Sequence, residues 1–451
     1  MENHTVVPRH RRIILFPLPY QGHVNPMLQL ANLLYSKGFS ITILHTNFNK
    51  PKTSNYPHFT FKFILDNDPH DERYSKLPLQ GMGSFARVLL FNECGADELR
   101  HQLELELSEK DVSCLVTDAY WYFTQSVADS LSLPRLVLRT TSLFCFPVFG
   151  SISLFHDLGY FNLSDNANME EQVVKFPVLK VKDIIKTGFK LQTNSILSNM
   201  VKHSEASSGI IWNSFKELEE PGLETILRDI PVPSFLIPFP KHFTSASSSL
   251  LEQDRTFFPW LDKQAPNSVV YVSFGSVSQV DERQFLEIVH GLVNSEQTFL
   301  WVIRPGFVEG STWLESFPDG FPGERGRIVN WAPQQEVLAH EAIGAFWTHG
   351  GWNSTFESVC EGVAMICSPF YGDQPLNARY MSDVWKMGVY LENGWERGEI
   401  ANAIRKVMVN EDGKEIKERA RNLKQKLNVS LMEGGYSYES LESLIAYINS
   451  F

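Results

Sequence analysis

The side chains best suited to chemistry lie in one stretch, which runs from Trp331 to Gln374. It opens with an aromatic ring and continues through an apolar run, a Gly-Gly turn, and a segment rich in Asn, Ser and Thr that is typical of a helix start. A flat ring can stack on a base, the N–H groups at a helix N-terminus can hold phosphates, and carboxylates can accept hydrogen bonds from hydroxyl groups. The pattern therefore predicts a site for a nucleotide-sugar.

The order of these residues predicts how they are placed. Ile343–His349 is a short apolar run that indicates a buried parallel strand, and the two glycines that follow allow a ligand to approach the backbone closely. Residues 353–355 then open a helix whose first N–H groups, with the helix dipole, form an anion site. Glu357 lies one turn further and is placed to accept hydrogen bonds from two ribose hydroxyls.

Asp373 and Gln374 follow the next predicted strand, Met365–Ser368, on the same carboxyl edge of the sheet. Ligands bind at this edge in open α/β folds, so both side chains are expected at sugar hydroxyls. Taken singly, each residue of the stretch also has an ordinary structural interpretation, Trp331 as core packing and Glu357 as a solvated helix face. The joint pattern favours the nucleotide-sugar site.

The stretch resembles, from end to end, the 44-residue signature box of the plant UDP-dependent glycosyltransferases, the family-1 enzymes that glycosylate small molecules. Gly350 stands where that family often has Cys, and Gly372 is at another variable position. The resemblance implies an α/β fold of the GT-B type, with two Rossmann-like doubly wound domains facing a cleft. It also implies UDP-glucose as donor substrate, favoured by Trp352 and Gln374, and no metal. The donor-binding residues that it implies are Asn25, Thr140, Thr141, Ser276, Trp331, Ala332, Gln334, His349, Gly351, Trp352, Asn353, Ser354, Glu357, Asp373 and Gln374.

A candidate general base lies near the N-terminus. The predicted strand Ile13–Phe16 leads through a Pro-rich loop to His23, just before a predicted helix. Histidine titrates near neutral pH and can deprotonate a hydroxyl, and a carboxylate such as Asp118, at the end of another strand, would fix its tautomer. From the residues themselves, helix capping explains either side chain equally well. The resemblance favours the catalytic pair, because both residues stand at the matching family positions.

The amino-acid composition favours a globular protein and disfavours proteins that bind nucleic acid or span a membrane. The chain has 451 residues, 43% hydrophobic and 20% charged, which is ordinary for a globular protein and long enough for two or three domains. Its formal charge of −12 disfavours nucleic acid or an anionic membrane as partner. The sequence has no apolar run of about 18 residues and no hydrophobic signal segment, so no membrane span is expected. Its five cysteines form no CxxC pair, which with the missing signal segment predicts a reduced, cytoplasmic protein, expected to be a monomer.

Strand-like and helix-like segments alternate through both halves, which predicts parallel sheets covered by helices. The predicted strands are 13–16, 40–45, 61–65, 114–118, 136–138, 269–274, 299–303, 343–349, 365–368 and 389–392. A Pro- and Ser-rich segment separates the halves. We therefore expect an N-terminal acceptor-binding domain at 1–240, a linker at 241–256 and a UDP-sugar-binding domain at 257–436. A C-terminal helix at 437–451 is expected to pack back on the first domain, as it does in the family.

The acceptor is expected to be a small hydrophobic molecule. Candidate pocket residues come from apolar, aromatic segments in which core packing explains most positions: Phe85, Phe91, Cys145, Phe149 and Phe155. Most of the chain resembles the plant subfamily that includes steviol glycoside glucosyltransferases, which implies a terpenoid or a terpenoid glycoside as acceptor. A flavonoid or other phenolic acceptor is an alternative, and a catalytically inactive nucleotide-sugar-binding protein is an alternative of another class. A dehydrogenase is disfavoured, because no GxGxxG motif follows the first strand.

Overall fold

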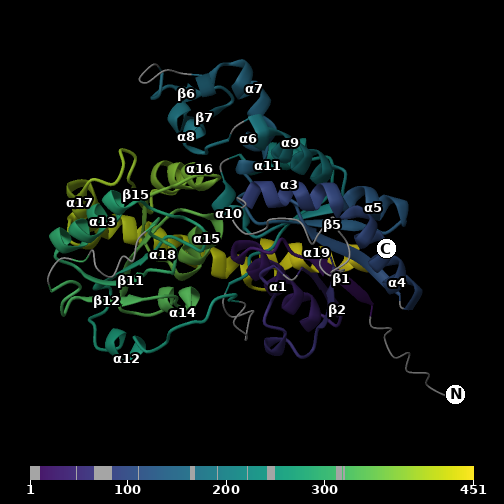
Figure 1. The fold of residues 1–451 in the computed structure, drawn as a ribbon, viewed down its shortest axis with the longest axis horizontal. Coiled ribbons are helices and arrows are strands. Elements are labelled where there is room, and N and C mark those ends of the chain that lie inside the picture. The colour runs from purple at the N-terminus through teal and green to yellow at the C-terminus, as the bar shows by residue number, and fades with distance from the viewer. Residues whose placement is uncertain are drawn as a thin grey trace.

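The computed structural model describes residues 11–46, 48–64, 84–109, 111–162, 168–189, 191–220, 222–240, 249–310, 317 and 320–451. Two parallel β-sheets, each flanked by helices, lie side by side (Figure 1). This arrangement confirms the predicted α/β fold with two Rossmann-like units. Residues 241–248 of the expected linker, and residue 65 of one predicted strand, lie outside the described residues.

The first sheet has seven strands in the order β3-β2-β1-β4-β5-β8-β9. Their bounds are β1 Arg12–Phe16, β2 Ser40–His45, β3 Thr60–Phe63, β4 Val112–Asp118, β5 Arg135–Arg139, β8 Gly209–Trp212 and β9 Ser234–Leu236. The direction of winding reverses between β1 and β4, which pair in parallel with Phe16 opposite Thr117. Their carboxyl ends therefore meet at a topological switch point, where ligands bind in such sheets.

The second sheet has six strands in the order β12-β11-β10-β13-β14-β15. Their bounds are β10 Val269–Ser273, β11 Thr298–Val302, β12 Gly326–Val329, β13 Ile343–Thr348, β14 Met365–Cys367 and β15 Gly388–Tyr390. Winding reverses between β10 and β13, with Ser273 opposite Thr348. Both strands are buried along their whole length, as their continuous apolar sequence indicates.

Helices cover the faces of both sheets. In the first half they are α1 Gln21–Ser36, α3 Ser84–Cys94, α4 Ala96–Glu109, α5 Thr124–Ser130, α6 Cys145–Gly150, α7 Ile152–Asp157, α8 Val181–Lys186, α9 Leu191–Glu205, α10 Lys216–Glu219 and α11 Leu223–Asp229, with the hairpin β6 Gln172–Val173 and β7 Phe176–Lys180. In the second half they are α12 Phe258–Leu261, α13 Glu282–Ser295, α14 Gln334–Leu338, α15 Trp352–Glu361, α16 Gln374–Arg379, α17 Arg397–Met408, α18 Glu411–Leu431 and α19 Tyr436–Asn449. None of the helices in the described part is long and apolar enough to cross a membrane.

Several elements differ from those predicted. The single helix expected within 83–107 is two helices, because Gly95 interrupts it between α3 and α4. The helix expected from Met27 begins at Gln21, so His23 lies in its first turn and not before it. Strands β8, β9 and β12 were not predicted, because they are short and lie next to Ser, Pro and Gly residues that indicate loops.

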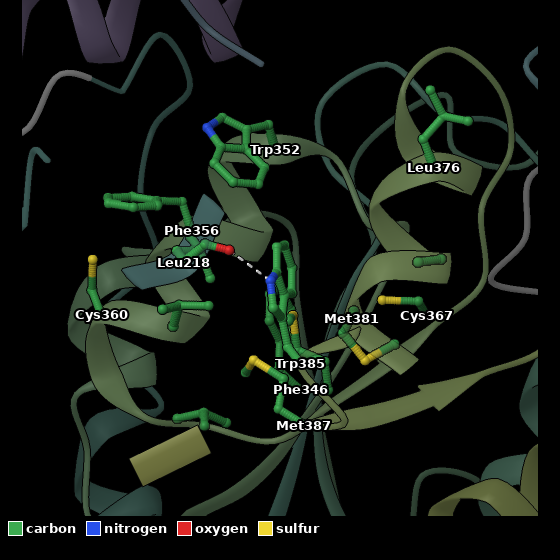
Figure 2. Close-up of a cluster of buried hydrophobic side chains, with 14 of the residues drawn as sticks. Leu218, Phe346, Trp352, Phe356, Cys360, Cys367, Leu376, Met381, Trp385 and Met387 are labelled. Carbon is green, nitrogen blue, oxygen red and sulfur yellow. Dashed lines mark hydrogen bonds between the residues drawn. The ribbon is translucent and has the colours of Figure 1, made fainter. Parts of the chain in front are cut away.

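Buried contacts join the two halves. Figure 2 shows a cluster of hydrophobic side chains in which Trp385 donates its indole N–H to the carbonyl oxygen of Leu218 at 2.8 Å. Leu218 belongs to α10 of the first half, whereas the other side chains labelled in the figure, Trp385 and Trp352 among them, belong to the second half. In addition, α19 returns to the first sheet and packs on β9 and β4, and its Tyr447 hydroxyl donates to the carbonyl of Ser208 at 2.8 Å. The relative position of the two sheets is therefore held by direct packing.

Candidate active site

A cavity of about 450 Å³ lies between the two sheets. Its lining comes from segments that follow the carboxyl ends of β1, β5, β10, β12, β13 and β14, so both switch points open onto it. The structure brings together His23 and every donor-binding residue predicted from the sequence. Those that line the cavity are His23, Asn25, Thr140, Thr141, Ser276, Trp331, Ala332, Gln334, His349, Gly351, Trp352, Asn353, Ser354, Glu357, Asp373 and Gln374.

His23 and Asp118 form a hydrogen-bonded pair at the edge of this cavity. Nδ1 of His23 lies 2.7 Å from a carboxylate oxygen of Asp118, and the Thr140 hydroxyl lies 3.1 Å from the same nitrogen. The Asp118 side chain is 1% exposed, and its other oxygen accepts the backbone N–H of Tyr120 at 3.0 Å. A buried carboxylate on Nδ1 favours the tautomer with its proton there, which leaves the lone pair of Nε2 available to a reactant.

Asn92 supports this pair, although nothing in the sequence pattern drew attention to it. Its side-chain amide, from α3, donates to the carbonyl of Tyr120 at 2.9 Å, and its amide oxygen accepts the N–H of Phe123 at 3.1 Å. These bonds fix the loop that follows β4 and so fix Asp118. An Asn inside a predicted helix carries no signal of such a role, because the partner lies in a distant segment.

The start of α15, which is the predicted anion site, lines the cavity. Gly351 caps the helix and His349 lies beside it, held between two glycines. A Cβ atom on Gly275 would come within 2.7 Å of the His349 ring, and one on Gly351 within 2.5 Å, so the backbone approaches the imidazole in a way that other residues would block. Burial, reinforced by the positive charge of Arg304, lowers the pKa of His349 to about 4. His349 is therefore neutral at neutral pH.

One hydrogen bond across the cleft follows from a proline. Pro26 lies inside α1 and has no N–H to offer the carbonyl of Gly22, four residues earlier. That carbonyl instead accepts the side-chain amide of Asn353, in the first turn of α15. The first turns of α1 and α15 are therefore linked directly, and His23 and the anion site sit on the linked turns.

The segment that begins at Trp331 forms one end of the cavity. The Trp331 indole N–H donates to the Ser249 hydroxyl at 2.9 Å, which fixes the plane of the ring. Glu357 accepts hydrogen bonds from the side chains of Gln334 at 2.7 Å and Gln335 at 3.3 Å. Burial raises the pKa of Glu357 to about 7, against these two bonds, which lower it. Once it is ionised, this carboxylate can accept hydrogen bonds from the hydroxyl groups of a ligand.

Asp373 and Gln374 lie at the other end, where α16 begins. Asn377 donates to a carboxylate oxygen of Asp373 at 3.0 Å, and burial raises the pKa of this carboxyl group. The amide oxygen of Gln374 accepts the backbone N–H groups of Phe370 and Tyr371 at 2.8 and 3.2 Å, which leaves its NH₂ group as a donor. The pair thus offers one acceptor and one donor side by side.

Trp352 is placed differently from the other residues predicted to bind the donor. It lines the cavity, but its side chain is buried in the cluster of Figure 2, with only 2% of the residue exposed. Its indole N–H donates to the carbonyl of Asn213 at 2.9 Å, across the two halves. The ring therefore acts as packing between the halves in this structure.

The side chains of four of the five expected acceptor residues are described, and these four do not line the cavity. Phe91, Cys145, Phe149 and Phe155 are buried in hydrophobic clusters, with Phe91 against Trp121 and Phe149 against Phe189. The side chain of Phe85 lies outside the described residues. Apolar and aromatic side chains of the first half that do line the cavity are Leu18, Tyr20, Val88 and Tyr120.

The anion site has no side-chain cluster suited to a metal ion nearby. Among the residues that the structure describes, no group of three or more His, Cys, Asp or Glu side chains is arranged to hold one. The start of α15 and Ser276 line the cavity together with His349, and they offer backbone N–H groups and a hydroxyl group. These donors suit an anionic ligand.

Comparison with known proteins agrees with this site. The family model "UDP-glucoronosyl and UDP-glucosyl transferase" matches residues 248–425. UDP-glycosyltransferase 76G1 of Stevia rebaudiana is 68% identical over the whole of both chains, and UDP-glycosyltransferase 76B1 of Arabidopsis thaliana is 45% identical over 97% of this chain and 98% of its own. The structure of Phytolacca americana UGT2 complexed with UDP-2fluoro-glucose and pterostilbene superposes with a TM-score of 0.81, 26% identity, and coverage of 97% of this chain and 99% of that one.

The fold, the residues that line the cavity and the similar proteins all indicate the same protein family. The full-length identity to curated glycosyltransferases covers both sheets, and the solved relative with a UDP-sugar has the same two-unit architecture. The expectation drawn from the Trp331–Gln374 stretch is confirmed at the level of the family. The chain belongs to the plant UDP-glycosyltransferases, hexosyltransferases of the GT-B fold that use a UDP-sugar donor and a small-molecule acceptor.

Proposed function

We propose that the protein transfers glucose from UDP-glucose to a hydroxyl or carboxyl group of a hydrophobic plant metabolite, with inversion at the sugar, to give a β-glucoside. The observation that carries this proposal is the placement of His23, hydrogen-bonded to the buried Asp118, in the same cavity as the α15 start and Glu357. An acid–base pair, an anion site and a hydroxyl acceptor within one cavity are what glycosyl transfer from a nucleotide-sugar requires.

Each part of the donor has a matching group. Trp331 would stack on the uracil, and Glu357 would accept the ribose hydroxyls. The N–H groups of the α15 start, with Ser276 and His349, would hold the diphosphate. Asp373 and Gln374 would bind hydroxyls of the sugar, and the paired acceptor and donor that they present support glucose. The UDP-2fluoro-glucose bound by the solved Phytolacca americana relative supports the same donor class.

The reaction would begin with His23. Nε2 takes the proton of the acceptor hydroxyl as its oxygen bonds to the anomeric carbon, and the bond from that carbon to the diphosphate oxygen breaks on the opposite face. Asp118 stabilises the imidazolium that forms, and the anion site receives the charge that develops on the departing UDP. Attack opposite the leaving group converts the α-linked donor into a β-glucoside.

The acceptor is proposed to be a terpenoid or a terpenoid glycoside. Support comes from the sequence resemblance to the plant subfamily of steviol glycoside glucosyltransferases and from the 68% identity to the Stevia rebaudiana relative. The apolar side chains of Leu18 and Val88 at the cavity suit a hydrophobic acceptor. A phenolic acceptor is the alternative, supported by the pterostilbene bound to the Phytolacca americana relative.

A panel of terpenoids, flavonoids and glycosides of both, incubated with UDP-glucose and followed by mass spectrometry, tests this function. A gain of one hexose on a terpenoid-type acceptor supports the proposal, and a gain on flavonoids only supports the alternative. UDP binding with no transfer and no hydrolysis of UDP-glucose would indicate an inactive nucleotide-sugar-binding protein. The cytoplasmic location and monomeric state expected from the sequence stay predictions.

A further inference from the structure

Arg304 is a buried cation that has no carboxylate partner among the residues that the structure describes. It follows β11 and is 9% exposed. Its guanidinium donates to backbone carbonyl oxygens, to Gly275 at 3.3 Å, to Pro305 at 3.2 Å and to Ser278. No carboxylate of the described ranges bonds to it, and the phenol of Tyr371 is the neighbouring group that favours its charge. Burial lowers the pKa of Arg304. A guanidinium nevertheless keeps its charge in proteins.

A buried charge of this kind is unfavourable unless an opposite charge compensates it. Carbonyl dipoles compensate in part, but most buried arginines also pair with a carboxylate. The absence of one here is notable, because Arg304 does not lie in a remote core. It lies directly behind the loop Gly275–Ser278, whose residues line the cavity beside His349.

The cavity itself lacks a positive side chain. The described residues that line it include no lysine and no arginine. His349, the nearest titratable base at the anion site, is neutral at neutral pH, because burial and Arg304 both lower its pKa. A diphosphate in this site would therefore meet N–H groups and hydroxyls at its surface and one full positive charge, that of Arg304, behind them.

We propose that Arg304 is the counter-charge of the donor diphosphate, acting through the Gly275–Ser278 loop and without touching the ligand. This inference rests on the proposed function of the cavity and deepens it. Arg304 has two effects in one position: its hydrogen bonds hold the loop that carries Ser276, and its charge lowers the energy of an anion on the other side of that loop. It is a positioning residue, and its benefit grows as negative charge develops on departing UDP.

The test compares UDP with uridine, which shares the base and ribose but has no charge. Binding of both is measured by calorimetry at neutral pH for the wild type, Arg304→Gln, Arg304→Lys and Arg283→Gln. Arg283 lies on the surface of the same half, with its side chain 82% exposed, so its replacement makes the same change in net charge away from the cavity. Circular dichroism and the melting temperature of each variant show whether it is folded.

Arg304→Gln should weaken UDP binding by about 10- to 100-fold and leave uridine binding within about twofold, since the lost charge acts on the diphosphate. Arg304→Lys should keep most of the preference for UDP, and Arg283→Gln should keep all of it. The pKa of His349, followed by NMR, should rise in Arg304→Gln, a shift that a purely structural role would not produce.

Two results would overturn the inference. If Arg304→Gln lost affinity for UDP and uridine equally, Arg304 would be only a structural support of the loop. If its preference for UDP over uridine were unchanged, the charge of Arg304 would not act on the ligand. If Arg304→Gln does not fold, the binding of UDP and uridine to Arg304→Lys is the test. This variant keeps the positive charge, so a loss of its preference for UDP would contradict the role of Arg304 as counter-charge. A wild type that binds UDP no better than uridine would instead refute the diphosphate site itself, and with it the proposed function.

Discussion

The guanidinium of Arg379 and the carboxylate of Asp183 form a bidentate ion pair between the two halves of the protein, with N–O distances of 2.9 and 3.2 Å. Asp183 belongs to α8 of the first half, and Arg379 ends α16, the helix that begins at Gln374. Both side chains are buried. The backbone N–H of Gly372 also donates to the carbonyl of Thr187, next to α8, at 2.8 Å. The segment that carries Asp373 and Gln374, the residues proposed to bind the sugar, is thus held from the first half at both ends.

Asp183→Ala should therefore lower the free energy of unfolding by about 3 kcal/mol, because it leaves the buried Arg379 charge with weaker compensation. Asp383→Ala is the matched control, since Asp383 bonds to the same guanidinium at 3.2 Å but has a side chain that is 48% exposed. That change should cost less than about 1 kcal/mol. Urea denaturation followed by tryptophan fluorescence measures both, and equal losses would contradict the importance assigned to the buried pair.

His23→Ala should lower the turnover rate by roughly 10²–10⁴-fold and leave the affinity for UDP-glucose little changed, because the base acts on the acceptor proton. Asp118→Asn should also lower turnover, since an amide no longer favours the reactive tautomer or stabilises the imidazolium. His58, which is exposed on the same half, provides the control, and His58→Ala should retain full activity. A near-normal rate for His23→Ala at neutral pH would refute His23 as the base.

Glu357→Ala should weaken UDP binding by about 1–3 kcal/mol, because the ribose hydroxyls lose a partly buried acceptor. Trp331→Ala should weaken it as well, through loss of the ring that stacks on uracil. Glu361 lies one turn further along α15 and bonds to Lys424 at 2.9 Å outside the cavity, so Glu361→Ala should not change UDP affinity. Calorimetry with UDP measures all three, and unchanged affinity in both of the first two variants would mean that the nucleotide binds elsewhere.

Uridine binding should become tighter as the pH rises from about 6 to 8. The pKa of Glu357 is raised to about 7 by burial, so the free protein carries a largely protonated carboxyl group below that pH. Ribose hydroxyls donate to the ionised form, so binding releases a proton and the affinity rises by up to about tenfold per pH unit below the pKa. Uridine avoids the titration of the phosphate, and Glu357→Gln should remove the dependence. A pH-independent wild type would contradict the role of Glu357.

Sequence patterns predicted those structural elements of the site that are formed by residues close together in the sequence. The strand end, the Gly-Gly turn and the helix start that follows are encoded within a few residues, so these elements were predicted directly, whereas an anion-binding role for the α15 start and a ribose-binding role for Glu357 stay predictions. The pairing of His23 with Asp118 was expected from the family resemblance, and the structure places the two side chains 2.7 Å apart because β1 lies beside β4. The family resemblance then selected the functional interpretation of each.

Features that depend on distant partners were not predicted. Arg304, Asn92 and the Arg379–Asp183 pair gain their roles from segments that meet only in the folded chain. The aromatic segment around Phe149 was expected at the acceptor, but large apolar side chains gain most by filling the core, and this one does so. A run of aromatic residues therefore gives little information about a binding pocket until the packing is known.

Activity should survive EDTA and should favour UDP-glucose over UDP-galactose. In the proposed site the diphosphate would be held by backbone N–H groups, Ser276 and the charge of Arg304, so a chelator should remove no group that binds it. Asp373 and Gln374 present an acceptor and a donor at fixed positions, so inverting one sugar hydroxyl leaves a buried polar group unpaired, at a cost of about 1–3 kcal/mol, or roughly 5- to 150-fold. Direct competition between the two donors, with and without chelator, measures both effects. Activity that EDTA abolishes and Mg²⁺ restores would refute diphosphate binding without a metal ion. Equal use of UDP-glucose and UDP-galactose would refute the roles of Asp373 and Gln374.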